Sequence, residues 1–89
     1  MDIIRCAAAG TMESSDAYVE IEPGDAGIEL RLESAVEAQF GDAIRAAVQE
    51  VLAELGVENA RVHVVDRGAL DCVIRARVET AILRGREDV

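Results

Sequence analysis

The sequence predicts an α+β fold in two layers, with an antiparallel sheet and two helices on one of its faces, in the order ββαββα. Three observations predict this fold. Short segments alternate apolar and polar residues as strands do, one long segment repeats apolar residues every three or four positions as helices do, and turns rich in glycine separate them. We expect residues 1–89 to form a single domain, because 89 residues suffice for one core.

Residues 17–22 and 28–33 are the first two predicted strands, since each alternates apolar with polar residues. The apolar face of the first strand consists of Ala17, Val19 and Ile21. Residues 23–27 contain one proline and two glycines, which are typical of turns. We therefore expect the two strands to pair as a hairpin.

A helix is predicted to begin after Ser34, because Ser34 and Glu37 have the spacing of a capping box. Apolar residues then recur at spacings of three and four and form one stripe. The stripe consists of Val36, Phe40, Ile44, Val48, Val51, Leu52 and Leu55. Gly56 follows at a position where helices often end in the left-handed conformation.

The last third of the chain begins with a predicted strand over residues 60–65, with Val62 and Val64 facing inward. A tight turn at residues 66–68 follows, and the segment after it fits both strand and helix periodicity. We expect a strand through Arg77 that returns from the turn, and then a short helix. The alternative is that residues 69–84 are wholly helical, and residues 84–89 are expected to be a frayed tail.

The composition excludes several classes of partner. A net charge of −9 makes nucleic acid and anionic membranes poor partners and favours a basic protein surface. The apolar runs are far shorter than the roughly 20 residues that cross a bilayer. Two cysteines without an export signal indicate a cytoplasmic protein with reduced thiols.

Few residues suggest chemistry of their own. Cys72 is expected to be a small core residue, and Cys6 and His63 lie too far from it in sequence to form a zinc pattern, so no metal and no catalytic residue are predicted. Arginines 75 and 77 are expected on the outward face of their strand, near arginines 31 and 61. There they would pair with carboxylates, or contact a partner subunit or phosphate groups.

The segment from Gly10 to Asp16 is polar, and no packing requirement explains it. From residue types alone, Ser14, Ser15 and Asp16 are typical of a solvated turn or a local cap. No histidine lies nearby in the sequence to act as a base, so a triad with a serine nucleophile has no support.

Three blocks, residues 10–16, 40–45 and 66–77, together resemble the citrate lyase acyl carrier protein (gamma subunit) family in sequence and order. The resemblance implies that residues 1–16 carry the prosthetic-group loop and that Ser14 bears phosphoribosyl dephospho-coenzyme A through a phosphodiester. Ser15 is the neighbour and is not implied. The Asp-Ser-Leu signature of phosphopantetheine carriers is absent, so a dedicated transferase is expected to attach the group.

The resemblance also implies a non-catalytic carrier of acetyl and citryl thioesters, which takes part in the cleavage of citrate to acetate and oxaloacetate. The implied partners are the citrate lyase alpha subunit (an acyl transferase), the beta subunit (a citryl lyase), the prosthetic-group transferase and an acetate-dependent ligase that acetylates the arm. Two alternatives stay open. One is a carrier of the malonate decarboxylase type, and the other is an unmodified acidic regulatory or scaffold subunit.

Overall fold

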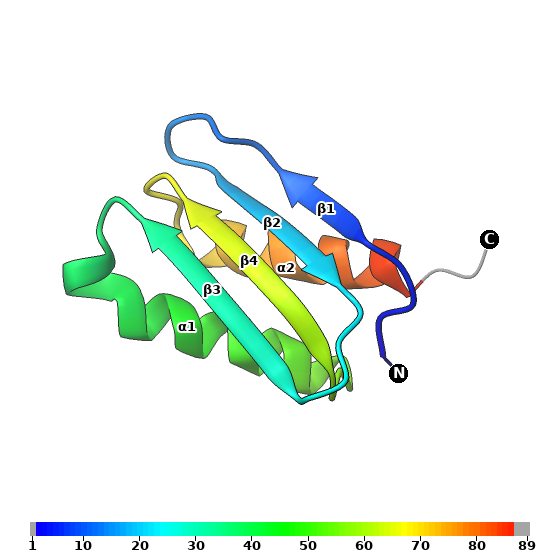
Figure 1. The fold of residues 1–89 in the computed structure, drawn as a ribbon. Helices are drawn as coiled ribbons and strands as arrows, with labels where there is room; N and C mark the ends of the chain where they lie inside the picture. Colours follow the sequence, from blue (N-terminus) through cyan, green and yellow to red (C-terminus); the bar gives the residue numbers. More distant parts are fainter. Residues whose placement is uncertain (1, 87–89) are drawn as a thin grey trace.

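A four-stranded sheet carries two helices on one face in the computed structural model, which describes residues 2–86 (Figure 1). The predicted α+β class and the helices on one face are therefore confirmed. The elements in chain order are β1 (Ala7–Gly10), β2 (Ala17–Glu22), β3 (Ile28–Ser34), α1 (Glu37–Glu54), β4 (Ala60–Asp66) and α2 (Asp71–Gly85).

The sheet is mixed, with strand order β1-β2-β4-β3. β2 pairs antiparallel with β1 and β4, whereas β3 pairs parallel with β4. The prediction of a wholly antiparallel sheet and of a hairpin between β2 and β3 is therefore wrong. Because β4 lies between these two strands, residues 23–27 carry the chain past the start of β4, and α1 then connects β3 to β4.

The core lies between the sheet and the helices. On the sheet, alternate residues of β2 and β4 are buried, namely Ala17, Val19, Ile21, Ala60, Val62 and Val64. On α1, the buried part of the predicted stripe consists of Ile44, Val48, Val51 and Leu52. Burial of each larger aliphatic side chain contributes about 1.5–3 kcal/mol. Phe40, which the stripe also included, is 53% exposed.

The start of α1 differs in detail from a capping box. The helix begins at Glu37 with Val36 as its N-cap residue, and no side chain caps it. The Ser34 hydroxyl accepts a hydrogen bond from the Val36 amide (3.1 Å) and donates one to Asp66 (2.8 Å). Ser34 therefore fastens the β3–α1 link to the end of β4. At the other end, Gly56 has φ +72°, the left-handed conformation predicted there.

α2 occupies the segment that we expected to begin as a strand. That expectation is wrong, and the helical alternative for residues 69–84 is confirmed from Asp71 onward. A strand after residue 68 would have no place beside β4, since β2 and β3 already occupy both of its edges. The helix instead turns Ile74, Val78 and Ile82 into the core. Cys72, predicted to be buried, is exposed.

The two ends of the described chain meet beside β1, a strand that the sequence did not predict. The amides of Ile4 and Arg5 both donate to the Gly85 carbonyl, at 2.9 and 3.0 Å. Of the residues expected to form a frayed tail, Arg84 and Gly85 belong to the last turn of α2, and Arg86 donates to the Leu55 carbonyl (2.6 Å). Residues 87–89 lie outside the described residues.

Candidate functional site

The segment that carries Ser14 is the loop between β1 and β2, residues 11–16. The pairing register places the ends of β1, β3 and β4 and the start of β2 at one end of the sheet. The Ser14 loop therefore lies at the same end as the β4–α2 loop and the β3–α1 link (Figure 1).

The loop contains a tight turn over residues 13–16, closed by a hydrogen bond from the Asp16 amide to the Glu13 carbonyl (3.2 Å). Ser15 has φ +66° and is the one residue other than glycine with a positive φ in residues 2–86. A positive φ at the third position alone is the pattern of a type II turn. Ser14 then occupies the second position, at the corner of the turn.

Ser14 and Ser15 are both exposed, but they differ in their hydrogen bonds. The Ser15 amide donates to the Arg67 carbonyl (2.8 Å), so the backbone of this residue is fastened to the β4–α2 loop. The Ser14 hydroxyl has no hydrogen-bond partner among the residues that the structure describes. Ser14 thus presents a free hydroxyl on an ordered turn.

Asp16 holds the base of the loop against α2. Both of its carboxylate oxygens accept from the Arg77 guanidinium at 3.0 Å, and one also accepts from the Thr11 hydroxyl at 2.7 Å. The Arg77 guanidinium, followed by the Thr11 hydroxyl and the Ala17 amide, holds the pKa of the Asp16 carboxyl well below its usual range. The negative charge of Asp16 is therefore paired with Arg77.

Gly10, the last residue of β1, permits the close approach of β1, the start of β2 and the Arg77 side chain. Its φ is +96°, and a Cβ at this position would overlap the Ala17 carbonyl oxygen and lie 3.1 Å from the Arg77 side chain. No other residue allows the two strands and the arginine to approach so closely.

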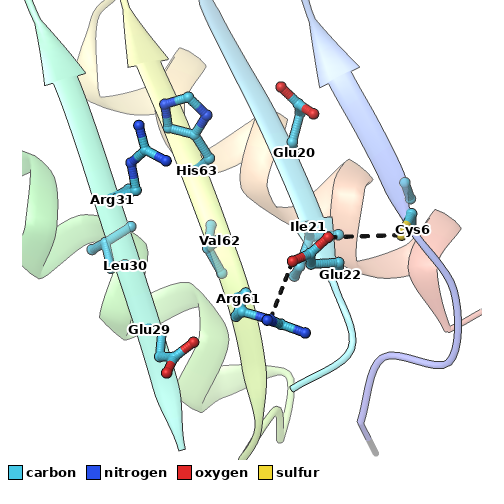
Figure 2. A pocket seen from close by; sticks show the side chains of 11 residues that line it. Cys6, Glu20, Ile21, Glu22, Glu29, Leu30, Arg31, Arg61, Val62 and His63 are labelled. Atoms are coloured by element: carbon cyan, nitrogen blue, oxygen red, sulfur yellow. Dashed lines mark hydrogen bonds and ion pairs between the residues drawn. The ribbon is translucent and has the colours of Figure 1, made fainter.

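The uncovered face of the sheet has a shallow groove of about 440 Å³ (Figure 2). Across the strands, Glu22 forms an ion pair with Arg61 at 3.1 Å, and the His63 ring, which also lines the groove, lies within hydrogen-bond distance of Glu33 at 2.8 Å. Figure 2 shows Cys6 beside β1 and His63 on β4, with β2 between them. The thiol and the imidazole therefore do not form a nucleophile–base pair.

The other predicted site residues are not brought together. Arginines 75 and 77 lie on α2, whereas arginines 31 and 61 lie on the uncovered sheet face, so the expected shared face is wrong. His63 faces outward as predicted, with 29% of its side chain exposed. In residues 2–86 there is no group of three His, Cys, Asp or Glu side chains placed to hold a metal, and no helix is long and apolar enough to cross a bilayer.

The sequence did not predict that Thr11, Arg67 and Arg77 hold the loop. The Asp16–Arg77 pair joins residues 61 positions apart, and the bond from Arg67 to the Met12 carbonyl spans 55 positions. Local periodicity reports neighbours within one element, so it carries no signal for such contacts.

Comparison with known proteins places the chain in a family. Residues 5–85 match the family described as malonate decarboxylase delta subunit (MdcD). The citrate lyase acyl carrier protein of Escherichia fergusonii is 56% identical over 88 residues, which cover 98% of this chain and 91% of that protein. The protein of the same name from Streptococcus mutans is 51% identical over 88 residues, covering 98% of this chain and 86% of that one.

A similar fold occurs in a chain of the Pseudomonas malonate decarboxylase hetero-tetramer that was solved in complex with malonate. The TM-score is 0.75 at 22% sequence identity, and the alignment covers 86% of this chain and 79% of that one. The family match over residues 5–85 and the 56% identity across 91% of the Escherichia fergusonii protein show the family of this chain. The chain belongs to the acyl carrier protein family that includes the citrate lyase acyl carrier proteins.

Proposed function

We propose that this chain is the acyl carrier subunit of a citrate lyase and that Ser14 is the attachment point of its prosthetic group. The observation that carries the proposal is the Ser14 hydroxyl, exposed at the corner of an ordered turn and without a partner in residues 2–86. A transferase can reach such a hydroxyl without unfolding the domain. The 56% identity to a citrate lyase acyl carrier protein supports the same role.

The proposed group is phosphoribosyl dephospho-coenzyme A, joined to Ser14 through a phosphodiester. When attached, it supplies the thiol that holds acetyl or citryl as a thioester. The residues around Ser14 fit a phosphodiester, because the Asp16 carboxylate is paired with Arg77 and the Arg67 guanidinium lies against the loop. Glu13 is exposed, so water and salt screen its charge.

The chain's own contribution is to hold the attachment point, because in residues 2–86 no side chain that could act as a base is hydrogen-bonded to the Ser14 hydroxyl. The loop stands on the sheet and on α2, both of which are packed on the core. A tethered acyl group reaches an effective concentration of roughly millimolar at neighbouring active sites. The proposed partners are the alpha and beta subunits, the transferase and the acetate-dependent ligase, in the cytoplasm.

A carrier of the malonate decarboxylase type is the second candidate, favoured by the description of the matching family and by the similar fold in the Pseudomonas complex. The identity of 22% to that chain, against 56% to a citrate lyase carrier, favours citrate. An unmodified acidic scaffold subunit remains the third alternative. It would use the net charge of −9 but not the free Ser14 hydroxyl.

Reconstitution tests the proposal. The chain that carries its prosthetic group, called the loaded chain, is combined with one of two sets of subunits. With the citrate lyase alpha and beta subunits, release of oxaloacetate is measured, and with the matching malonate decarboxylase subunits, release of carbon dioxide is measured. We expect oxaloacetate to form from citrate only when the loaded chain is present. If the loaded chain is active with the malonate decarboxylase subunits but not with the citrate lyase subunits, the second candidate is established. If the unloaded chain supports the same rate of oxaloacetate release as the loaded chain, the chain is a scaffold.

A further inference from the structure

Arg67 is in contact with the Ser14 loop on both sides of the serine. Its carbonyl accepts from the Ser15 amide (2.8 Å), and its amide donates to the Asp16 carbonyl (2.9 Å). Its side-chain Nε donates to the Met12 carbonyl (3.2 Å). Arg67 is thus hydrogen-bonded to Met12, two positions before Ser14, and to Ser15 and Asp16, the two residues after it.

The Arg67 guanidinium has unused hydrogen-bonding capacity. A guanidinium carries five N–H donors, and here only the one on Nε has an acceptor among the residues that the structure describes. Arg77, the other arginine at this loop, differs because Nε and Nη2 are both engaged by Asp16. Arg67 is exposed, and neither of its terminal nitrogens has an acceptor in residues 2–86.

The terminal nitrogens of Arg67 lie within reach of a group on Ser14. Consecutive Cα atoms are about 3.8 Å apart, so the Cα atoms of Met12 and Ser14 are separated by at most roughly 7 Å. The Nε atom of Arg67 is already 3.2 Å from the Met12 carbonyl oxygen. Rotation about side-chain bonds then brings a phosphate on the Ser14 oxygen beside the guanidinium.

The charges around Ser14 favour this contact. Asp16 is paired with Arg77, and Glu13 is the exposed carboxylate next to the serine. On a chain of net charge −9, a phosphodiester adds one more negative charge to this edge. Arginine forks match phosphate oxygens with two parallel hydrogen bonds, which a point charge does not provide.

We propose that Arg67 is the phosphate-binding residue of the loop and that its guanidinium holds the phosphodiester on Ser14, so that the arm leaves the domain in one direction. This inference rests on the proposed function, because it needs a phosphodiester on Ser14. Arg67 acts as a positioning residue and takes no part in acyl transfer. Its contact fixes the first bonds of the arm and leaves the distal thiol free to move.

The experiment uses loaded and unloaded full-length chain, with ³¹P NMR of the phosphodiester and ¹H–¹⁵N NMR of the arginine Nε groups. In the wild type, we expect loading to shift the Arg67 Nε–H signal, and we expect added salt to return it toward its unloaded position. An Nε–H signal with the same salt dependence in both forms would overturn the proposal. This readout needs no variant.

The variant Arg67→Gln tests the same contact from the side of the phosphate. In loaded Arg67→Gln, the salt dependence of the ³¹P shift is lost, and in Arg67→Lys it is partly retained. Arg84→Gln is the matched control, since Arg84 is also exposed and donates to one backbone carbonyl, that of Ala8 (2.8 Å). Identical ³¹P signals in wild type and Arg67→Gln would contradict the proposal, whereas a wild type that cannot be loaded would refute the proposed function instead.

Discussion

The Arg77 guanidinium and the Asp16 carboxylate form a two-pronged pair, with one hydrogen bond of 3.0 Å to each carboxylate oxygen. The pair joins the loop that carries Ser14 to the middle of α2. Only 15% of the Asp16 side chain is exposed. Arg77 therefore fixes the base of the loop, while the corner of the turn stays open to solvent. This separation of a held base from a free corner suits an attachment point.

The pair makes stability depend on pH in the acid range. The pKa of Asp16 is lowered from its ordinary value of 3.8, so its stabilising effect is complete above this value and is lost as pH falls through the lower, folded-state pKa. We expect the wild type to unfold at a higher temperature than Asp16→Asn at pH 7. The difference narrows as the pH falls below 4, which thermal unfolding at a series of pH values measures.

Glu79→Gln is the control for this prediction, because it removes one negative charge from an exposed residue of α2 that has no ion pair in residues 2–86. Its unfolding temperature should follow that of the wild type at every pH. A constant difference between wild type and Asp16→Asn down to the lowest pH would show that the Asp16 charge is not stabilised by the fold.

Gly10 should tolerate no side chain. In Gly10→Ala, the left-handed conformation and the overlap with the Ala17 carbonyl together lower the free energy of unfolding by about 2–4 kcal/mol. Gly27→Ala separates the two effects, because Gly27 has φ +82° but no atom within 4 Å of the added Cβ. We expect this control to lose about 1–2 kcal/mol in urea unfolding. Equal losses would exclude a role for close packing at Gly10.

Ser15 is held in a conformation that serine rarely adopts, with φ +66°. Ser15→Gly removes the strain and should change the free energy of unfolding by roughly 0–1 kcal/mol in the stabilising direction. Ser15→Val should lower it by about 1–2 kcal/mol, since a β-branched residue is disfavoured there. Chemical unfolding of both variants checks this order, and the reverse order would contradict the turn geometry.

Both cysteines are exposed, which gives a direct check on α2. We expect Cys6 and Cys72 to react with a thiol reagent in the folded protein at rates close to those in the unfolded chain. If the segment after residue 68 were instead a strand with Cys72 facing the core, only one thiol would react before unfolding. Counting modified thiols by mass spectrometry distinguishes the two structures.

The sequence predicted those elements whose pattern is set by one buried face. Such elements alternate or repeat apolar residues in one register only, so their periodicity identified them. They are strands 17–22 and 60–65 and the helix that ends before Gly56. The segment around Ile74 satisfied both periodicities, and the competition for the edges of β4 decided between them. Pairing partners are a property of the whole sheet, which no single segment encodes.

β1 illustrates the same limit, because three of its four residues are alanines, which have little preference for strands. It is a strand because its residues, Ala7 to Gly10, pair with the edge of β2. At the site, the turn residues around Ser14 predicted an exposed loop. The arginines that hold the loop come from positions more than 50 residues away and were visible only in the folded chain.

The intact mass of the protein and of two serine variants, purified from cells that contain the transferase and are cleaving citrate, tests the central claim most directly. We expect the mass of one prosthetic group on the wild type and on Ser15→Ala, with fragmentation placing it on Ser14, and the bare chain mass for Ser14→Ala. A modified Ser14→Ala, or a wild type that carries no added mass in such cells, would contradict the assignment of Ser14 as the attachment point.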